Sequence, residues 1–286
     1  MIMKPKLRAV QPSLVEHEGA PFILLRDPLS LAEGSLLIPQ AVGPLLLLCD
    51  GGRDMNELEQ AFLEYTGIQL PQGFMEQMIA KLDDMFLLDN GRSEDAVNMA
   101  LEAFRAARHR VPALSGGGYP SDAGELRLLL SSYIDGHTVE EPSGLVRGII
   151  SPHIDYQRGG AVYAQVWQKA ALAIENAERV IIFGTNHNGG KNLFGFTRQD
   201  YSTPLGVIST DVDTVDRIAG IIGHDIAFED ELYHINEHSI ELALVWLQYY
   251  LGNNSSCQLI PILCGSFERF VHGEQDPGSD NEIEVL

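Results

Sequence analysis

Two histidines directly follow apolar runs, and this placement suits metal chemistry. His153 lies in SPHIDYQRGG, after the apolar run GLVRGII, and His187 lies in GTNHNGG, after the apolar run RVIIF. Neutral imidazole is the most frequent metal ligand among protein side chains. A single histidine in such a place is more often a surface or hydrogen-bonding residue, but two at neighbouring strand ends can converge on one ion.

A metal held by two imidazoles needs further ligands, and the usual ones are a carboxylate, a thiolate or a third histidine. The sequence offers Asp155, Glu237, His238, Cys264 and Asp225. For two of these residues, a role in the fold explains their position equally well without a metal. Cys264 ends an apolar run, which is typical of a packed thiol. Glu237 falls in the first turn of a predicted helix capped by Asn236, where the helix dipole favours a carboxylate in any case.

The elements that must position these side chains alternate between helix and strand. The pattern predicts helices at 123–136, 159–178, 211–223 and 237–252, strands at 144–151, 179–185 and 257–265, and two strands around a turn within 193–210. Strands that are Val/Ile/Leu runs rather than strict alternations are typical of burial on both faces. We therefore predict an α/β domain with a mainly parallel sheet and flanking helices.

Sheet geometry explains why the two histidines should meet. A strand–helix–strand crossover is right-handed and returns the second strand parallel to the first. Residues 144–151, 159–178 and 179–185 fit such a unit, so His153 and His187 are expected at the same carboxyl edge of the sheet. Open α/β sheets bind their ligands at that edge.

The first 90 residues have a different pattern. FILLRDP predicts a strand, and amphipathic helices follow, so we expect a small winged-helix-like α+β domain over 1–90, a connecting helix over 91–110 and the α/β domain over 111–286. Asp54 or Asn56 is the expected cap of one helix. A short strand is expected at MFLLDN. The expected core positions of the helices are Leu58, Phe62, Tyr65, Met75, Met78, Ile79 and Leu82.

The composition excludes several classes of function. The chain has 286 residues and a formal net charge of −21, from 40 acidic and 19 basic residues. Such a surface repels phosphate backbones and anionic lipids, so nucleic-acid and membrane binding are not expected. The cysteines are sparse and odd in number, at Cys49, Cys257 and Cys264, which fits a reducing compartment. With no apolar run long enough for a membrane span, we expect a cytoplasmic protein.

Several linked motifs resemble the MEMO family, also called AmmeMemoRadiSam system protein B. In order, they are SGGGYPSDAGEL, ISPHIDYQRGG, FGTNHNGG, STPLGVISTD, NEHSIELALVWLQYY and LIPILCGS. The resemblance implies the α/β fold of the class III extradiol dioxygenases, with a divalent metal in a pocket at the strand ends. Iron is the expected metal, with copper and zinc as alternatives.

The resemblance also implies roles for individual residues. His153 and His187 map onto metal ligands of the family, and Glu237 to Ser239 map onto a stretch that lines the pocket. Glu237 and His238 are the expected catalytic residues, acting as acid and base or by orienting a ligand. The expected lining residues are Asp155, Tyr156, Asn186 and Ser239.

Three departures from the family pattern are visible. The first histidine motif of the family usually reads Pro-His-Ala-Gly-Tyr, and here Ile154 and Asp155 replace Ala and Gly. The second motif usually reads Gly-Pro-Ser-His, and here Thr185 and Asn186 replace Pro and Ser. The later Asp-Phe-Cys/Ser-His-Trp segment and a downstream Cys of the family are not found. By composition alone, the acidic tail GEQDPGSDNEIEVL would be a disordered terminus. The missing family segments instead imply a truncated linker, so we expect the C-terminal part of the domain to be absent.

The first part of the chain more loosely resembles PqqD-like modules, winged-helix folds that hold leader peptides for radical-SAM enzymes. The likeness lies in AVGPLLLLCDGGRDMNELEQAF. The resemblances imply a radical-SAM protein and an AMMECR-type protein as partners.

Two functions then fit the sequence. One is a metal-dependent, dioxygenase-like oxidoreductase, and the other is a non-catalytic peptide-binding or adaptor protein.

Overall fold

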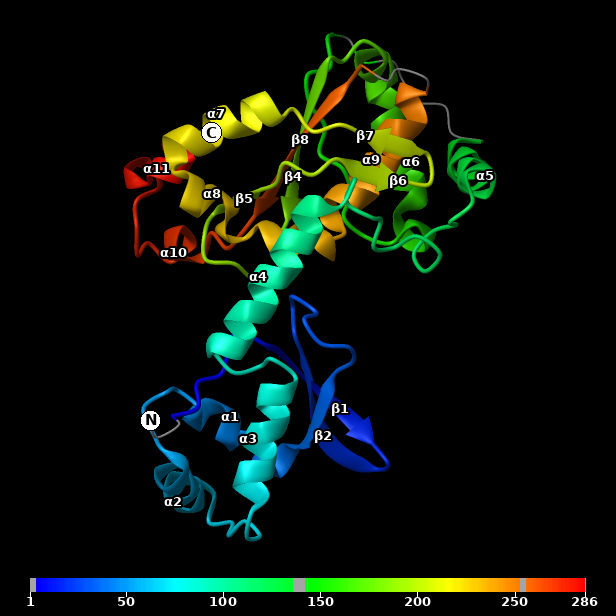
Figure 1. The fold of residues 1–286 in the computed structure, drawn as a ribbon. Coiled ribbons are helices and arrows are strands. Elements are labelled where there is room, and N and C mark those ends of the chain that lie inside the picture. The colour runs from blue at the N-terminus through cyan, green and yellow to red at the C-terminus, as the bar shows by residue number, and fades with distance from the viewer. Residues whose placement is uncertain (1–3, 136–141, 143, 253–255, 286) are drawn as a thin grey trace. The chain divides into compact units, whose positions relative to one another are not determined.

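The chain forms two compact units, Met1–Ala103 and Phe104–Leu286 (Figure 1). The computed structural model describes residues 4–135, 142, 144–252 and 256–285. The division falls within helix α4 (Gly91–Ala106), which is the helix predicted to connect the two domains. Within the described residues, every helix is too short or too polar to cross a lipid bilayer.

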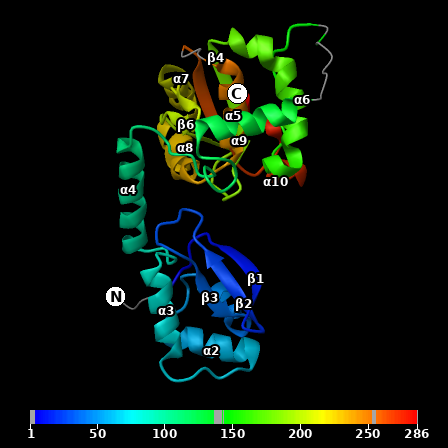
Figure 2. The same ribbon diagram turned by 90° about the vertical axis from the view of Figure 1, so that its right-hand side faces the viewer.

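The first unit combines a small antiparallel sheet with helices (Figure 2). The strands are β1 (Gln11–His17), β2 (Ala20–Arg26) and β3 (Leu36–Pro39), in the order β1-β2-β3. The helices are η1 (Gln40–Val42), α1 (Pro44–Leu48), α2 (Met55–Thr66) and α3 (Phe74–Asp84). The predicted strand at MFLLDN is wrong, because this segment makes a single bridge between Leu88 and Leu7.

Local sequence explains where α2 begins and ends. The Asp54 carboxylate accepts a hydrogen bond from the Glu57 backbone N–H, and the Glu57 carboxylate accepts one from the Asp54 N–H. Gly67, with a φ of 69°, ends the helix in the left-handed region. Tyr65 was predicted to be a core residue but is 70% exposed, because the last turn of α2 presents it to solvent. The other predicted core residues are buried, namely Leu58, Phe62, Met75, Met78, Ile79 and Leu82.

The second unit has a three-stranded central sheet in the order β4-β8-β5. Its strands are β4 (Arg179–Thr185), β5 (Phe194–Phe196) and β8 (Gln258–Cys264), and β6 (Tyr201–Thr203) with β7 (Gly206–Ile208) form a separate hairpin. The longer helices are α5 (Ala123–Ile134), α6 (Tyr156–Glu175), α7 (Val212–Ile222) and α9 (Ser239–Leu251). Short helices are α8 (His224–Glu229), η2 (Glu231–Ile235), α10 (Glu268–Val271), η3 (Pro277–Ser279) and α11 (Asn281–Val285).

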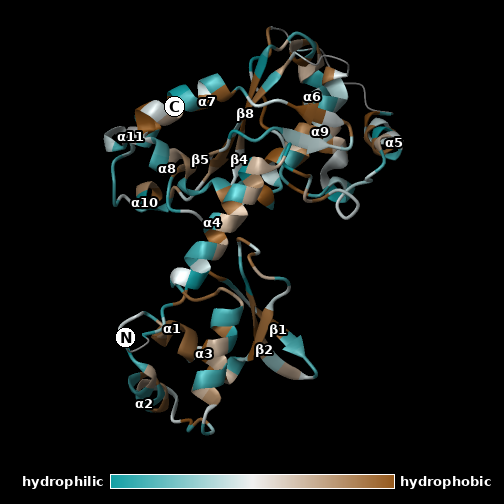
Figure 3. Ribbon diagram, viewed as in Figure 1, coloured by the Kyte–Doolittle hydropathy of each residue, from teal (hydrophilic) through white to brown (hydrophobic). Residues whose placement is uncertain are grey.

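The middle strand β8 is buried on both faces, as its apolar sequence predicted. Leu259 and Leu263 pack in the cluster formed with α6 and α9, whereas Ile260 and Ile262 pack in the cluster formed with α7 and α8. The hydropathy colouring shows this apolar centre (Figure 3). Burial on both faces removes the need for alternating polar residues.

Two predictions about the sheet are wrong. Residues 144–151 do not form a strand but coil, and in the described part of the chain no other strand pairs with the outer edge of β4. The sheet is also mixed rather than mainly parallel, because β5 pairs antiparallel with β8 while β4 pairs parallel with it. Without a ladder partner, two apolar side chains of this segment stay in water, Leu145 at 77% and Ile150 at 94% exposure, whereas Val146 and Ile149 pack partly against the core.

The acidic tail packs against the rest of the second unit, so it is not the disordered terminus that its composition alone suggests. The carboxylate of Glu282 accepts hydrogen bonds from the backbone N–H groups of Leu193 and Phe194, at 3.0 and 3.2 Å. Arg269 forms an ion pair with Asp280 at 2.7 Å. The tail thus satisfies backbone donors at the edge strand β5, which the composition of the segment does not reveal.

Candidate metal centre

Three histidines from separate segments meet in the second unit. His153 precedes α6, His187 follows β4, and His238 is the N-cap residue of α9. Their ring centroids lie 4.6 Å apart for His153 and His187, 5.0 Å for His153 and His238, and 4.9 Å for His187 and His238. One ring nitrogen of each lies within 4.8 Å of the other two. The convergence of His153 and His187 therefore occurs without the predicted strand before His153.

The carboxylate of Glu237 lies directly behind this cluster and is nearly inaccessible to solvent, with the residue 2% exposed. Its Oε2 accepts from the His187 backbone N–H at 2.8 Å, and its Oε1 accepts from the backbone N–H groups of His238 and Ser239 at 2.7 and 3.0 Å. Burial raises the pKa of Glu237, but the donors of His187 and Ser239 outweigh it and hold the pKa below its usual value. Glu237 is therefore an ionised carboxylate that fixes the backbone of two histidines.

The same carboxylate sets the tautomer of one imidazole. His187 Nδ1 lies 3.1 and 3.2 Å from the two Glu237 oxygens, and a carboxylate can only accept. Nδ1 therefore carries the proton, and Nε2 carries the lone pair that a metal requires. Burial and the neighbouring rings of His187 and His238 lower the pKa of His153, which favours its neutral, metal-binding form.

A close contact between β4 and α9 places His187 beside His238. The Ser239 hydroxyl donates to the carbonyl of Thr185 at 2.9 Å. Gly184 leaves the space for this approach, because a Cβ there would lie 2.5 Å from Ser239 Oγ and 2.6 Å from Ile240 Cγ1. The end of β4 and the start of α9 are thus held together at van der Waals distance.

Gly184→Ala is therefore expected to destabilise the second unit by about 1–3 kcal/mol, the usual cost of overpacking. Urea unfolding followed by tryptophan fluorescence measures this, because both tryptophans, Trp167 and Trp246, are buried in the second unit. Gly220→Ala in α7 is the matched control, since a Cβ there meets nothing within 4 Å and the substitution should be neutral or stabilising. Equal stability of the two variants would contradict the packing argument.

The loop after His187 is held from its far side by Asp230. The Asp230 carboxylate accepts from the backbone N–H groups of Lys191 and Asn192, at 2.9 and 3.0 Å. Gly190 allows this with a φ of 147°, and a Cβ there would lie 2.8 Å from Asp230 Oδ2. Asn186 closes a turn within the same loop, as its side-chain oxygen accepts from the Asn188 N–H at 3.1 Å.

The remaining candidate ligands lie outside the histidine cluster. Asp155 is the N-cap of α6, where its side chain accepts from the Arg158 N–H. Asp225 lies in α8. Cys264 is half-buried at the end of β8, and burial raises the pKa of its thiol to about 11. Among the predicted lining residues, Tyr156 is buried and its hydroxyl donates to the carbonyl of Leu242 at 2.7 Å.

A groove of about 810 Å³ opens beside His153. It runs between residues 146–153 and β4, and its floor comes from α6 and α9. Ser239 and Thr185 are polar groups of its lining, and most of the wall is apolar, including Ile149, Trp167, Ile181, Phe183 and Leu247. This size and lining are typical of small-molecule sites.

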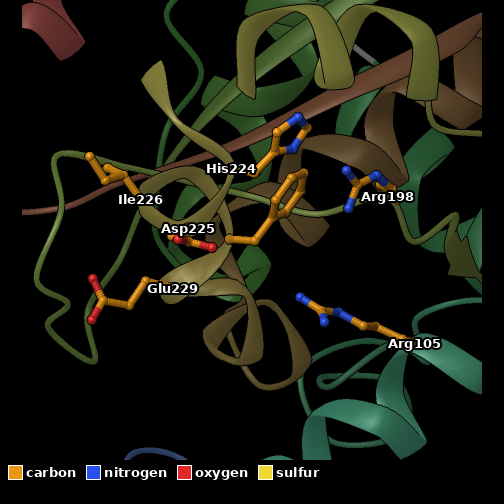
Figure 4. Close-up of a pocket in the computed structure, with 7 residues that line it drawn as sticks. Arg105, Arg198, His224, Asp225, Ile226 and Glu229 are labelled. Carbon is orange, nitrogen blue, oxygen red and sulfur yellow. The ribbon is translucent and has the colours of Figure 1, made fainter. Parts of the chain in front are cut away.

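A second hollow, of about 530 Å³, lies away from the histidine cluster (Figure 4). Arg105, Arg198 and His224 give it a cationic character. However, Arg105 pairs with Glu231 at 2.5 Å, and Arg198 pairs with Asp216 at 2.5 Å while its guanidinium lies over the Phe228 ring. Because both guanidinium groups already have carboxylate partners, this hollow is a poor anion site.

A buried histidine that the sequence did not single out lies behind the site. The His234 side chain is inaccessible, with Nε2 3.1 Å from the Gly195 carbonyl and Nδ1 2.6 Å from the Tyr201 hydroxyl. Since a carbonyl only accepts, Nε2 carries the proton and Nδ1 accepts from Tyr201. Burial lowers the pKa of His234 to about 3. No motif or spacing distinguishes this residue from an exposed loop histidine.

His234 gives a pH dependence with a defined sign. Its pKa is about 3 when folded and 6.5 in the reference state, so the unfolded chain takes up the extra proton first as pH falls below 6.5. The stabilisation is fully present above pH 6.5 and declines towards pH 3, by about 1.4 kcal/mol per pH unit. Urea unfolding of wild type and His234→Gln between pH 7 and pH 4.5 measures this, and the variant should lack that part of the decline. Parallel curves for the two proteins would contradict it.

Comparison with known proteins identifies the second unit. The sequence model of the family described as Memo-like protein matches residues 110–273, more than half of the chain. The chain belongs to the Memo-like protein family. The match contains all three clustered histidines and Glu237, so the candidate metal centre lies within the Memo-like region.

Relatives from bacteria and archaea support this membership. A MEMO1 family protein of Aquifex aeolicus is 29% identical over 247 residues, covering 86% of this chain and 63% of the relative. MEMO1 family proteins of Methanosarcina acetivorans and Ignicoccus hospitalis are 34% and 35% identical over 156 and 164 residues, covering 54% of this chain and 54% and 55% of those proteins. The chain thus spans between about half and less than two thirds of the length of these relatives.

The Aquifex match also bears on the first unit. The 247 aligned residues exceed the length of Phe104–Leu286, so the alignment includes part of Met1–Ala103. The similarity to this relative therefore extends beyond the Memo-like region.

Proposed function

We propose that this Memo-like protein binds a divalent metal through His153, His187 and His238. The observation that carries the proposal is the convergence of three imidazoles, each from a different segment, in front of the buried carboxylate of Glu237. Nitrogens bound to one zinc ion at about 2.0–2.1 Å lie within about 4.2 Å of each other. Small ring rotations would bring the three nitrogens, now within 4.8 Å, into one coordination sphere.

The donor set fits a metal for a second reason. Each imidazole must be neutral to bind, and burial together with the neighbouring rings of His187 and His238 disfavours protonation at His153. Metal-ligating histidines usually donate their other N–H to a carboxylate, and Glu237 is such a partner for His187. Iron is the expected ion, with copper and zinc as alternatives, because imidazole suits all three.

In this proposal the protein is related to the class III extradiol dioxygenases. A bound iron ion would supply Lewis-acid and redox chemistry. His238 acts as a ligand and Glu237 as a positioning group, since the Glu237 carboxylate is ionised and already accepts several N–H groups. The groove beside His153 admits the substrate, and Ser239 lies on its wall. We place the protein in the cytoplasm, where free thiols persist.

Metal analysis of the full chain tests this proposal. Protein purified without chelators is expected to retain iron, copper or zinc, and the double variant His153→Ala/His187→Ala is expected to lose it while keeping its tryptophan fluorescence. A wild-type chain without any of the three metals, together with unchanged metal content in the double variant, would overturn the proposal.

The first unit favours a second function, that of a peptide-binding or adaptor protein. It folds as a separate compact unit, and its outer strand β1 leaves one edge without a strand partner in the described residues. Peptides bind such edges by adding a strand. We propose a PqqD-like, winged-helix role in which this unit recruits a peptide or a radical-SAM protein, with an AMMECR-type protein as a further partner.

A pull-down with the radical-SAM protein separates this second function from the first. The full chain is expected to capture the partner, and a chain lacking residues 1–90 is expected to fail. Equal capture by both would contradict a role for the first unit, and it would leave the metal proposal untouched.

A further inference from the structure

Arg110 is a buried cation whose backbone is fixed within the second unit. It is 1% exposed, its N–H donates to the Asp200 carbonyl at 2.7 Å, and its carbonyl accepts from the Ser202 N–H at 3.1 Å and the Ser202 hydroxyl at 2.8 Å. Hairpin strand β6 therefore holds the chain at Arg110 in one place. The guanidinium extends from this fixed point into the core.

The guanidinium contacts the turn that leads to the candidate metal centre. Arg110 Nε donates to the carbonyl of His234 at 2.9 Å, and Nη2 donates to the carbonyl of Glu237 at 2.6 Å. Nη1 donates to the carboxylate of Glu241, in the first turn of α9. One planar group thus fixes both ends of residues 234–237 and the beginning of α9, a geometry that only the arginine fork provides.

Glu241 completes the arrangement as a buried counter-ion. It is 0% exposed, and its carboxylate also accepts from the backbone N–H groups of Ala113 and Leu114, at 2.7 and 2.9 Å, and from the Tyr119 hydroxyl. A buried ion pair is expensive to desolvate and often adds little net stability over an apolar pair. The specific effect of this pair is that Glu241 holds the Arg110 guanidinium in place, so that Arg110 can bind the backbone carbonyl of Glu237.

We propose that Arg110, held by Glu241, is a positioning residue for the metal centre. Arg110 binds the backbone carbonyl of Glu237, and the side chain of Glu237 binds His187 and the backbone of His238. The chain of contacts runs from the guanidinium through Glu237 to two of the three proposed ligands. This inference rests on the proposed metal-binding function.

Arg110→Lys keeps the charge but replaces the rigid fork with a point donor, so it tests position rather than charge. We expect two changes. In the metal-free protein, the imidazole ¹⁵N shifts of His187 should move as its Nδ1–H bond to Glu237 loosens. Binding of Co²⁺, followed by its visible absorption, should weaken about 10- to 100-fold, the range for partners that support metal ligands.

Arg105→Lys is the matched control, because Arg105 also pairs with a buried glutamate, Glu231, but has no contact with Glu237 among those described. It should leave both readouts at their wild-type values. If the Arg110→Lys variant does not fold, the Glu241→Gln variant serves as the test variant instead, and Glu231→Gln is the control for it. Wild-type His187 shifts and Co²⁺ affinity in either folded test variant would overturn the proposal, as would unfolding of both test variants while both controls fold.

The two readouts also separate this inference from the metal proposal. A wild-type chain that binds no Co²⁺ would defeat the proposed function. The His187 shifts of the metal-free protein would still decide whether Arg110 positions the imidazole.

Discussion

Replacing any one of the three clustered histidines by alanine is expected to weaken zinc binding by about 100-fold or more. Loss of a ligand removes a direct metal bond, so it should cost at least as much as the loss of a supporting partner, which typically costs 10- to 100-fold. Isothermal titration calorimetry with Zn²⁺ on the variants His153→Ala, His187→Ala and His238→Ala measures the loss of affinity. His238 is the most informative, because sequence reasoning left it between a ligand and an acid or base.

The control is His224→Ala, which removes an exposed histidine from the second hollow rather than from the cluster. Its zinc affinity should equal that of wild type. Loss of affinity in His224→Ala comparable to that in His238→Ala would mean that zinc binds to scattered surface imidazoles. Wild-type affinity in all three cluster variants would have the same meaning.

The second large effect is expected for Glu237→Gln. Glutamine has nearly the same shape, but an NH₂ group takes the place of one carboxylate oxygen. Backbone N–H groups donate to both oxygens of Glu237, and an NH₂ group cannot accept a hydrogen bond from them. We expect zinc affinity to fall about 10- to 100-fold, because His187 loses the partner that fixes its tautomer. The buried, mismatched amide should also lower the free energy of unfolding by about 1–3 kcal/mol.

Glu229→Gln is the matched control for this change. Glu229 is a more exposed carboxylate that pairs with Lys191 at 2.5 Å, and such surface pairs contribute about 0–1 kcal/mol. Its stability and zinc affinity should stay close to wild type. If Glu237→Gln behaves like Glu229→Gln, the carboxylate neither supports the imidazoles nor stabilises the turn into α9.

The sequence predicted those parts of the fold that depend on local pattern. The apolar run at 257–265 forms strand β8, which is buried on both faces. The helix predicted at 237–252 corresponds to α9, in which Ile240, Leu244 and Leu247 are fully buried. Asp54 was predicted as one of two possible caps, and the structure shows it in a capping box. Such features are encoded within a few residues, so their physical cause is visible in the sequence.

Features that depend on distant partners were not predictable in the same way. Residues 144–151 have the composition of a strand but form coil, because a strand also requires a ladder partner. The packing of the acidic tail depends on donors at Leu193 and Phe194 that only the folded chain brings near Glu282. Helix α9 begins at Ser239 rather than after Asn236, since the Glu237 side chain takes the N–H groups of His238 and Ser239.

The candidate site shows the same division. His153 and His187 were paired by an argument about strand ends, and the structure brings them together although one of those strands is absent. The buried cation Arg110 gave no signal, because an arginine in a basic stretch such as RHR looks like a surface residue. Its partners lie more than 120 residues away in sequence, at His234, Glu237 and Glu241.

The central claim is that His153, His187 and His238 bind one metal ion together, and X-ray absorption spectroscopy tests it most directly. The full chain loaded with one equivalent of zinc should show three imidazole nitrogens at about 2.0–2.1 Å. His238→Ala should show one imidazole fewer at the metal. A spectrum with oxygen ligands only, or an imidazole count that His238→Ala leaves unchanged, would contradict the claim.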